Sequence, residues 1–170
     1  MTKRIFEGAH LLVFQSEDWE YAERKKGKSA VAVVAVTEDG KLVLTEQFRR
    51  AVNARVIDLP AGLVGDEDGV DDPERTARKE LEEETGYSCD SVELLTSGPT
   101  SPGITSEQMS LYRARGVRKK GAGGGVAGES ITVQLAGLEE LEPWLQRKIE
   151  SGVQIDMKVW AGSYFLTKST

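Results

Sequence analysis

The chain has 170 residues, 39% of them hydrophobic and 29% charged, and a formal net charge of −6. This length favours a single domain with a substantial core, so we expect residues 1–170 to form one unit. The longest apolar run, residues 30–36, is far shorter than the ~20 residues of a membrane span, so we expect no membrane segment. The acidic balance argues against nucleic acid as the main partner, because phosphate backbones select basic surfaces.

Cys89 is the single cysteine of the chain, so no internal disulfide can form. A lone thiol fits a reducing compartment, and residues 11–14 are too short an apolar stretch for a signal peptide. We therefore expect a cytoplasmic protein.

The first sixty residues have the patterns of strands, expected at 9–14, 19–24, 29–36, 41–48 and 55–59. The Val- and Ala-rich segment 29–36 is typical of a strand that is buried on both faces. The turn residues Glu38, Asp39 and Gly40 suggest that this segment and the next strand form a hairpin.

A helix is expected over residues 73–85. Asp72 is a good N-cap, Pro73 suits the first helical position, and Gly86 is a good C-terminal stop. Further strands are expected at 91–96, 108–115 and 131–135, with a loop at 97–103 and helices at 138–151 and 154–166. The order lacks a regular βαβ alternation, which favours an α/β or α+β sandwich with mixed sheet over a doubly wound fold.

Three carboxylates share one face of the expected helix. At ~100° per residue, Glu80, Glu83 and Glu84 fall within one arc of about 100°, and no basic residue lies between them. One interpretation is a solvated acidic face, the usual meaning of a run of charges. The other is a site for a hard cation such as Mg²⁺ or Mn²⁺, which oxygen ligands on one rigid face would suit.

The order of residues around these glutamates resembles the Nudix box, in which Gly is followed by Glu and then by Arg-Glu-apolar-x-Glu-Glu-x-Gly-apolar. Residues 80–87 fit the core of that pattern, from Glu80 to Tyr87. Lys79 takes the place of the Arg and Asp71 that of the first Glu. Five residues separate the leading Gly from the first Glu in the pattern, and Gly65 has this spacing from Asp71. However, Gly62 follows the expected strand 55–59 and resembles the leading Gly more closely.

The resemblance to the Nudix family implies a fold, a dimer and a metal. It implies an α/β/α sandwich with mixed sheet over about residues 29–170, preceded by an N-terminal antiparallel sheet over about residues 1–28. By the same resemblance, these first strands are exchanged between the subunits of a homodimer. The glutamates Glu80, Glu83 and Glu84, with the backbone carbonyl of Ala61, would hold Mg²⁺, with Mn²⁺ as a substitute.

Two further segments resemble the ADP-ribose pyrophosphatase subfamily. Pro102 and Glu107 fit a signature that shapes the ribose side of its site, although a Pro-Gly turn is also a common structure. Residues 46–50 are similar to its Glu-Gln-aromatic-Arg segment, which implies that Arg49 contacts the diphosphate. Trp19 and Arg24 fall in the exchanged strands, so Trp19 either stacks on the nucleobase or closes the core as a rim aromatic.

The catalytic base has two candidates. In the subfamily it is a Glu on a mobile loop before the last strand, and Glu129 is the acidic residue of the corresponding segment, 121–130. Five of residues 121–128 are Gly, which favours a moving segment. Glu129 could instead be a further metal ligand, in which case Glu83 would be the base.

The resemblance implies a metal-dependent hydrolase that cuts ADP-ribose into AMP and ribose 5-phosphate. One alternative is a hydrolase of other nucleoside diphosphate sugars, such as GDP-mannose or ADP-glucose. Another is a nucleotide-sensing module without catalysis; such modules usually lose box glutamates, and this chain keeps Glu80, Glu83 and Glu84.

Overall fold

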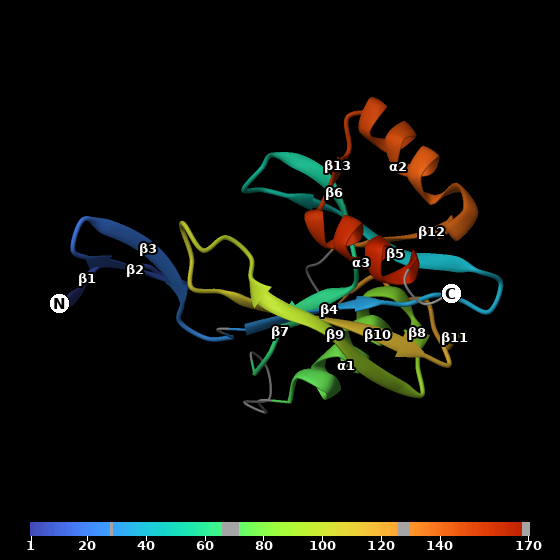
Figure 1. The fold of residues 1–170 in the computed structure, drawn as a ribbon, viewed down its shortest axis with the longest axis horizontal. Coiled ribbons are helices and arrows are strands. Elements are labelled where there is room, and N and C mark those ends of the chain that lie inside the picture. Colours follow the sequence, from blue (N-terminus) through green and yellow to red (C-terminus); the bar gives the residue numbers. More distant parts are fainter. Residues whose placement is uncertain (28, 66–71, 126–129, 168–170) are drawn as a thin grey trace.

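An antiparallel sheet formed by the N-terminal strands projects from one end of the molecule (Figure 1). The computed structural model describes residues 1–27, 29–65, 72–125 and 130–167. The strands of this sheet lie in chain order and are β1 (Thr2–Glu7), β2 (Leu11–Ser16) and β3 (Trp19–Arg24). The sheet confirms the expected pair of N-terminal strands and adds β1, which the sequence analysis missed.

Two four-stranded mixed sheets form the body of the molecule. The first has the order β7-β4-β10-β9 and contains β4 (Ser29–Val34), β7 (Ala61–Leu63), β9 (Ser91–Pro99) and β10 (Gln108–Arg115). The second has the order β12-β5-β6-β13 and contains β5 (Lys41–Arg49), β6 (Ala54–Asp58), β12 (Thr132–Gly137) and β13 (Gln154–Ile155). A small sheet pairs β8 (Tyr87–Ser88) with β11 (Arg118–Lys119). β4 runs parallel to β10, as does β6 to β13, while the other pairs are antiparallel.

The helices lie on opposite sides of the sheets (Figure 1). They are α1 (Pro73–Thr85), a 3₁₀ turn (Leu138–Glu140), α2 (Leu141–Glu150) and α3 (Met157–Thr167). In Figure 1, α1 lies below the sheet that contains β4, and α2 and α3 lie above it. Within the described residues, no helix has the length and apolar character needed to cross a membrane.

Strand β4 separates two hydrophobic clusters, which explains its burial on both faces. Its residues Val31 and Val33 pack with Ala77 and Leu81 of α1, whereas Ala32 and Val34 belong to the cluster that includes residues of α2 and α3. Residues 31–35 are completely buried. The alternation of side chains along a strand sends successive residues to opposite faces, so an all-apolar strand holds α1 on one side and the second sheet on the other.

Helix α1 has the expected bounds. The Asp72 side chain accepts a hydrogen bond from the Arg75 amide, Pro73 starts the helix, and Gly86 ends it with a left-handed φ of +70°. These features confirm the capping signals, which act locally and therefore do not depend on the rest of the fold.

The expected hairpin of residues 29–36 and 41–48 is wrong. β4 and β5 lie in different sheets, and backbone pairing joins their segments near the turn, through the bridge between Val36 and Leu42 and a hydrogen bond from the Val43 amide to the Ala35 carbonyl. The separation of the strands lets each pair with partners from later in the chain. Two other expectations also need correction: 97–99 belong to β9 rather than to a loop, and 154–155 form β13 before α3 begins.

The buried carboxylate of Glu46 connects several elements of the second sheet. Only 6% of Glu46 is exposed. It accepts hydrogen bonds from Arg55 of β6 (2.5 Å), Gln134 of β12 (2.9 Å) and Lys148 of α2 (3.2 Å). Burial would raise the pKa of this carboxyl, but the hydrogen bonds and charges of Arg55 and Lys148 lower it below its ordinary value overall.

We expect Glu46→Gln to lower the free energy of unfolding by about 1–3 kcal/mol at neutral pH, because it leaves buried donors without a charged acceptor. A lowered folded-state pKa means that the carboxylate stabilises the fold fully above the ordinary value of 4.5 and loses this effect as the pH falls through the lower folded-state value. Urea denaturation at pH 7 and below pH 4 should therefore show the difference between variant and wild type shrinking in acid. Glu93→Gln, which removes an exposed partner of Arg115, is the control and should change little. Equal effects of the two substitutions would contradict the role of Glu46.

Candidate active site

A cleft of about 1080 Å³ lies between α1 and the wall formed by β5, β6 and α3. Its described lining contains acidic and basic side chains in similar numbers. The acidic ones are Asp58, Glu80, Glu83, Glu84, Glu107 and Asp156, and the basic ones are Arg24, Arg49, Arg75, Lys79 and Lys158. The three glutamates of α1, Ala61, Arg49, Arg24 and Glu107 are thus brought to one cleft, as the sequence analysis expected.

Two of the α1 glutamates lie against strand β7, which follows β6. Glu84 is only 7% exposed, and its Oε2 accepts a hydrogen bond from the Ala61 amide at 3.0 Å. A Cβ atom on Gly62 would lie 2.0 Å from Oε1 of Glu80, so only glycine lets this carboxylate approach the backbone. Gly62 therefore contacts the acidic face of α1.

The third glutamate has a basic neighbour on its own helix. Lys79 Nζ lies 3.6 Å from Glu83 Oε2, one helical turn away. The expectation that no basic side chain neutralises the carboxylates is therefore wrong for Glu83. The helical spacing of four residues brings such pairs together.

The residues present fit a hard divalent cation in chemistry and in place. Carboxylate and carbonyl oxygens are the ligands that Mg²⁺ prefers, and Glu80 and Glu84 both meet the backbone at 61–62. Within the described residues, no three acidic side chains are arranged to hold an ion between them. A cation would therefore draw together carboxylates that contact the Ala61 amide and Lys79 in this structure.

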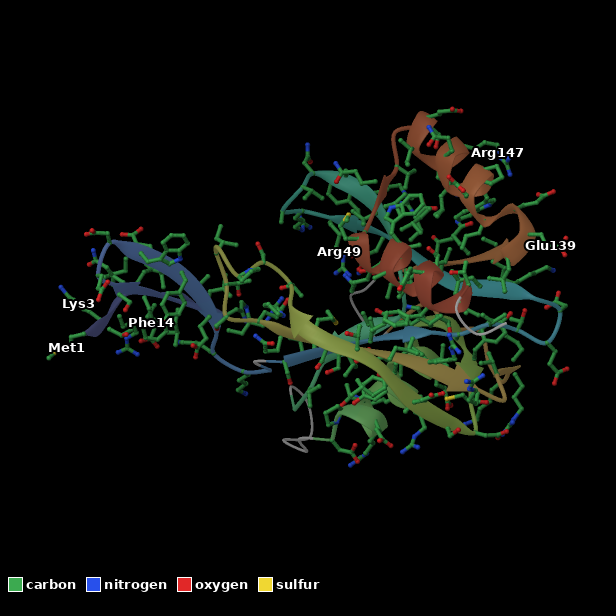
Figure 2. The ribbon with its side chains drawn as sticks, in the orientation of Figure 1. Met1, Lys3, Phe14, Arg49, Glu139 and Arg147 are labelled. Atoms are coloured by element: carbon green, nitrogen blue, oxygen red, sulfur yellow. The ribbon has the colours of Figure 1, made fainter. Side chains whose placement is uncertain are left out.

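The opposite wall of the cleft carries a buried ionic network that the sequence analysis missed. Lys158 Nζ lies 3.1 Å from Asp58 Oδ2 and 2.7 Å from Asp156 Oδ2, and Arg49 Nη2 lies 3.8 Å from Asp58. Figure 2 shows Arg49 beside α3. Burial raises the pKa of Asp58, which is 4% exposed. Burial alone would lower the pKa of Lys158, yet the charges of Asp58 and Asp156 raise it, so the lysine stays protonated.

Arg24 and Glu107 form an ion pair at another edge of the cleft. Arg24 Nε donates to Glu107 Oε2 at 2.7 Å, and Thr100 Oγ1 donates to the other oxygen at 3.4 Å. A backbone bridge between Ala22 and Thr105, two residues before Arg24 and Glu107 respectively, also joins β3 to the 100–107 loop. The pair therefore links the projecting sheet to the 100–107 loop, and each side chain already has a charged partner.

Trp19 and Pro102 are not among the described residues that line the cleft. Trp19 is 59% exposed at the tip of the β2–β3 hairpin and belongs to neither hydrophobic cluster, so its alternative role in closing the core is wrong for this chain. Pro102 is exposed in the 100–107 loop. Glu129, the candidate base, and Asp71, which takes the place of the first Glu of the box, lie outside the described residues.

Removal of the lysine from the buried network should be costly. We expect Lys158→Met to lower the free energy of unfolding by about 3–5 kcal/mol, because it leaves Asp58 buried without its nearest cation. The double variant Asp58→Asn/Lys158→Met should recover much of that loss. Lys41→Met, which breaks an exposed pair with Asp39, is the control and should have little effect. Thermal and urea denaturation would compare wild type, the two single variants and the double variant. Equal losses of stability in Lys158→Met and Lys41→Met would contradict the role of Lys158.

Comparison with protein families gives a match over most of the chain. The family model described as the NUDIX domain matches residues 26–153. The matched range contains α1 and strand β7, which together form the acidic wall of the cleft.

Several curated relatives are a third or more identical to the chain over the residues that align. It is 40% identical over 126 residues to the methanol dehydrogenase activator of Bacillus methanolicus, covering 70% of this chain and 66% of that protein. It is 37% identical over 119 residues to the ADP-ribose pyrophosphatase of Bacillus subtilis, covering 66% and 62%. It is 34% identical over 142 residues to the GDP-mannose pyrophosphatase of Cronobacter sakazakii, covering 78% and 70%. The chain thus spans less than two thirds of the length of the first two relatives.

The fold itself is similar to that of a solved structure described as an ADP compounds hydrolase. The TM-score is 0.68 at 18% identity, with 86% of this chain and 80% of the other covered. This likeness confirms the expected mixed α+β fold with several sheets. The match of the NUDIX domain model over residues 26–153 establishes that the chain belongs to the Nudix family.

Proposed function

We propose that this Nudix protein hydrolyses the pyrophosphate bond of nucleoside diphosphate sugars, with ADP-ribose as the first substrate to test. The observation that carries the proposal is the cleft in which three glutamates of α1 face a wall that contains Arg49. An anionic diphosphate needs cations on both sides, since its charge must be compensated before water can attack phosphorus. The names of the relatives, which include ADP-ribose and GDP-mannose pyrophosphatases, support the same class of substrate.

Nudix hydrolases generally need a divalent cation, and we propose Mg²⁺, with Mn²⁺ as a substitute. The oxygens of Glu80, Glu83 and Glu84 and the Ala61 carbonyl would hold it, joined by Glu129 as a further ligand in the alternative in which Glu83 is the base. When bound, such ions stabilise charge on phosphoryl oxygens and lower the pKa of bound water.

The side chains of the cleft have separate tasks in this proposal. Arg49 binds the diphosphate, for which the planar guanidinium fork suits pairs of phosphate oxygens. Arg24 and Glu107 contact the substrate at the edge formed by the projecting sheet, and Pro102 shapes the adjoining 100–107 loop. Either Glu129 or Glu83 takes the proton of the attacking water, and Lys79 beside Glu83 favours Glu129 as the base. The P–O bond to the bridging oxygen breaks and yields AMP and ribose 5-phosphate.

The test of this function is a hydrolysis screen with Mg²⁺ over ADP-ribose, ADP-glucose, GDP-mannose, dinucleotides and oxidised dNTPs, with phosphorus NMR of the products. We expect ADP-ribose to give the highest kcat/KM and to yield AMP. A preference for GDP-mannose would support the alternative that the Cronobacter relative's name suggests. The absence of turnover with every compound would overturn the enzymatic proposal in favour of a nucleotide-sensing module.

Glu84→Gln should lower kcat by at least about 100-fold, or roughly 2.7 kcal/mol. The variant removes one charge from the acidic face, while the amide oxygen of Gln can still accept the hydrogen bond of the Ala61 amide, so the fold should be kept. Glu82→Gln is the matched control, because Glu82 lies on the same helix but pairs with Lys120. Steady-state kinetics at saturating Mg²⁺ would rule out the assignment if Glu84→Gln turned over like the control.

We further propose that the chain is a homodimer of single-domain subunits, in which the projecting sheet of residues 1–28 reaches the partner's cleft. Large apolar side chains of this sheet are exposed in the single chain: Met1, Ile5, Phe6, Leu11 and Trp19. Figure 2 shows Met1 and Phe14 on this sheet, at the end of the molecule away from α2. Exposed apolar surface of this kind is typical of interaction sites. The cytoplasm, a reducing compartment, is the proposed location of the dimer.

Trp19→Ala tests whether the projecting sheet completes the site. Stacking on a base is worth ~1–3 kcal/mol and is tolerant of base identity, so the variant should raise KM about 5- to 100-fold for adenine and guanine substrates alike and keep kcat. Tyr164→Ala, an exposed aromatic outside the cleft, should leave KM unchanged. Sedimentation should show a dimer at micromolar concentration. An active monomer would exclude the shared site, and an unchanged KM would exclude stacking by Trp19.

A further inference from the structure

The backbone segment 119–125 caps the C-terminal end of α1. Gly125 donates its amide to the Glu83 carbonyl at 3.1 Å, and Gly124 donates to the Glu84 carbonyl at 2.8 Å. Lys119 Nζ donates to the Thr85 carbonyl at 2.8 Å. The Gly86 carbonyl accepts the amides of 120 and 121 at 2.8 and 2.9 Å.

These bonds satisfy four consecutive carbonyls, 83 to 86, from one segment. The last carbonyls of a helix have no partner within the helix and carry its negative partial charge. In α1 that end lies next to Glu83 and Glu84, so donors from 119–125 compensate negative charge at the same place. The glycine segment was expected to move; in this structure Gly121, Gly124 and Gly125 of the segment are hydrogen-bonded to the end of the helix.

The contact requires glycine on both sides. Gly123 has a φ of +73°, and a Cβ atom there would lie 2.3 Å from the Thr85 carbonyl carbon and 2.6 Å from the Gly86 nitrogen. A Cβ atom on Gly86 would lie 2.3 Å from the Gly121 oxygen. Both near neighbours are backbone atoms, which cannot rotate away as a flexible side chain can. An added methyl group at Gly123 must therefore shift the segment or the end of α1.

The atoms that an added methyl group would meet belong to Thr85 and Gly86, which directly follow two residues of the acidic wall. Glu83 and Glu84 each offer a carbonyl to the segment and a carboxylate to the cleft. Glu84 is also held from the other side by the Ala61 amide. A change in the backbone at 83–84 thus changes where both carboxylates start, whereas Glu80 lies one turn earlier, beside Gly62.

We propose that segment 119–125 is a backbone clamp that positions Glu83 and Glu84 for cation binding, with Gly123 as its positioning residue. This inference rests on the proposed function, since it concerns the same carboxylates. The clamp acts through the peptide groups of the helix and touches no substrate. The alternative to the clamp is a purely structural role, in which the segment stabilises the fold and does not affect the affinity for cations.

The experiment compares Gly123→Ala with Gly40→Ala in the full chain. Gly40 also has a positive φ, +73°, but a Cβ atom there meets nothing within 4 Å. The control thus imposes the same backbone strain without the clash. Mn²⁺ binding without substrate is measured by electron paramagnetic resonance and calorimetry, with circular dichroism to confirm folding. We expect Gly123→Ala to bind Mn²⁺ about 10- to 100-fold more weakly than wild type, the usual range for groups that orient metal ligands, and Gly40→Ala to bind it normally.

A second measurement needs no variant. Because coupling between two sites is reciprocal, saturation of the wild-type protein with Mg²⁺ alone should slow hydrogen exchange at the amides of Gly124 and Gly125, measured by mass spectrometry. Equal Mn²⁺ affinity in the two glycine variants would overturn the clamp. If Gly123→Ala does not fold, hydrogen exchange that is unaffected by Mg²⁺ in the wild-type protein would overturn it instead. In either case, turnover by the wild-type protein would leave the proposed function standing. A wild-type protein that neither binds Mn²⁺ nor hydrolyses ADP-ribose would overturn both.

Discussion

Helix α1 approaches the backbone of strand β7 at residues 61–62 so closely that no side chain at Gly62 would fit between them. The acidic wall depends on this contact. The missing Cβ of Gly62 leaves room for the Glu80 carboxylate, and the Ala61 amide holds Glu84. The helix keeps this position because its apolar face, with Ala77 and Leu81, is completely buried against β4. Three like charges on one face repel one another; here burial of the opposite face and the two backbone contacts offset that repulsion.

The cleft combines two walls with different means of compensating charge. On the α1 wall, Glu83 has Lys79 and Glu84 has a backbone amide, partners that leave each carboxylate with further oxygen lone pairs. On the opposite wall, the buried carboxyl of Asp58 is paired with the ammonium group of Lys158, so its partner is a side chain of the protein itself. Buried charges are tolerated only when they are paired or coordinated. The α1 wall is therefore the one suited to exchange its present partners for a cation, and the Asp58 wall the one suited to hold Arg49 in place.

The features that local chemistry decides could be predicted from the sequence. The bounds of α1 followed from Asp72, Pro73 and Gly86, and the acidic face followed from helical spacing alone. Strands β3 and β10 also have their expected bounds. The hairpin of residues 29–48 failed because a turn signal does not say whether the strands beside it pair with each other or with later strands, and here β4 pairs with β10.

The missing parts of the site depend on contacts between distant segments. Nothing in the residues around Lys158 indicates that it meets Asp58, a hundred positions earlier in the chain. The glycines of 121–125 were visible as a composition bias, but their positive φ angles and their approach to Gly86 appear only in three dimensions. The sequence pattern suggested motion, and the backbone bonds to Glu83 and Glu84 add a contact that the composition could not indicate.

The central claim is that the α1 glutamates and the Ala61 carbonyl form one cation site, and anomalous diffraction from a crystal soaked in Mn²⁺ tests it most directly. We predict an anomalous peak bonded to carboxylate oxygens of Glu80 and Glu84 and to the Ala61 carbonyl, at the ~2.0–2.2 Å expected for small divalent ions with oxygen ligands. The account would be contradicted if the protein binds Mn²⁺ to saturation in solution but its crystals show the ion elsewhere, with the α1 carboxylates still bound to Ala61 and Lys79.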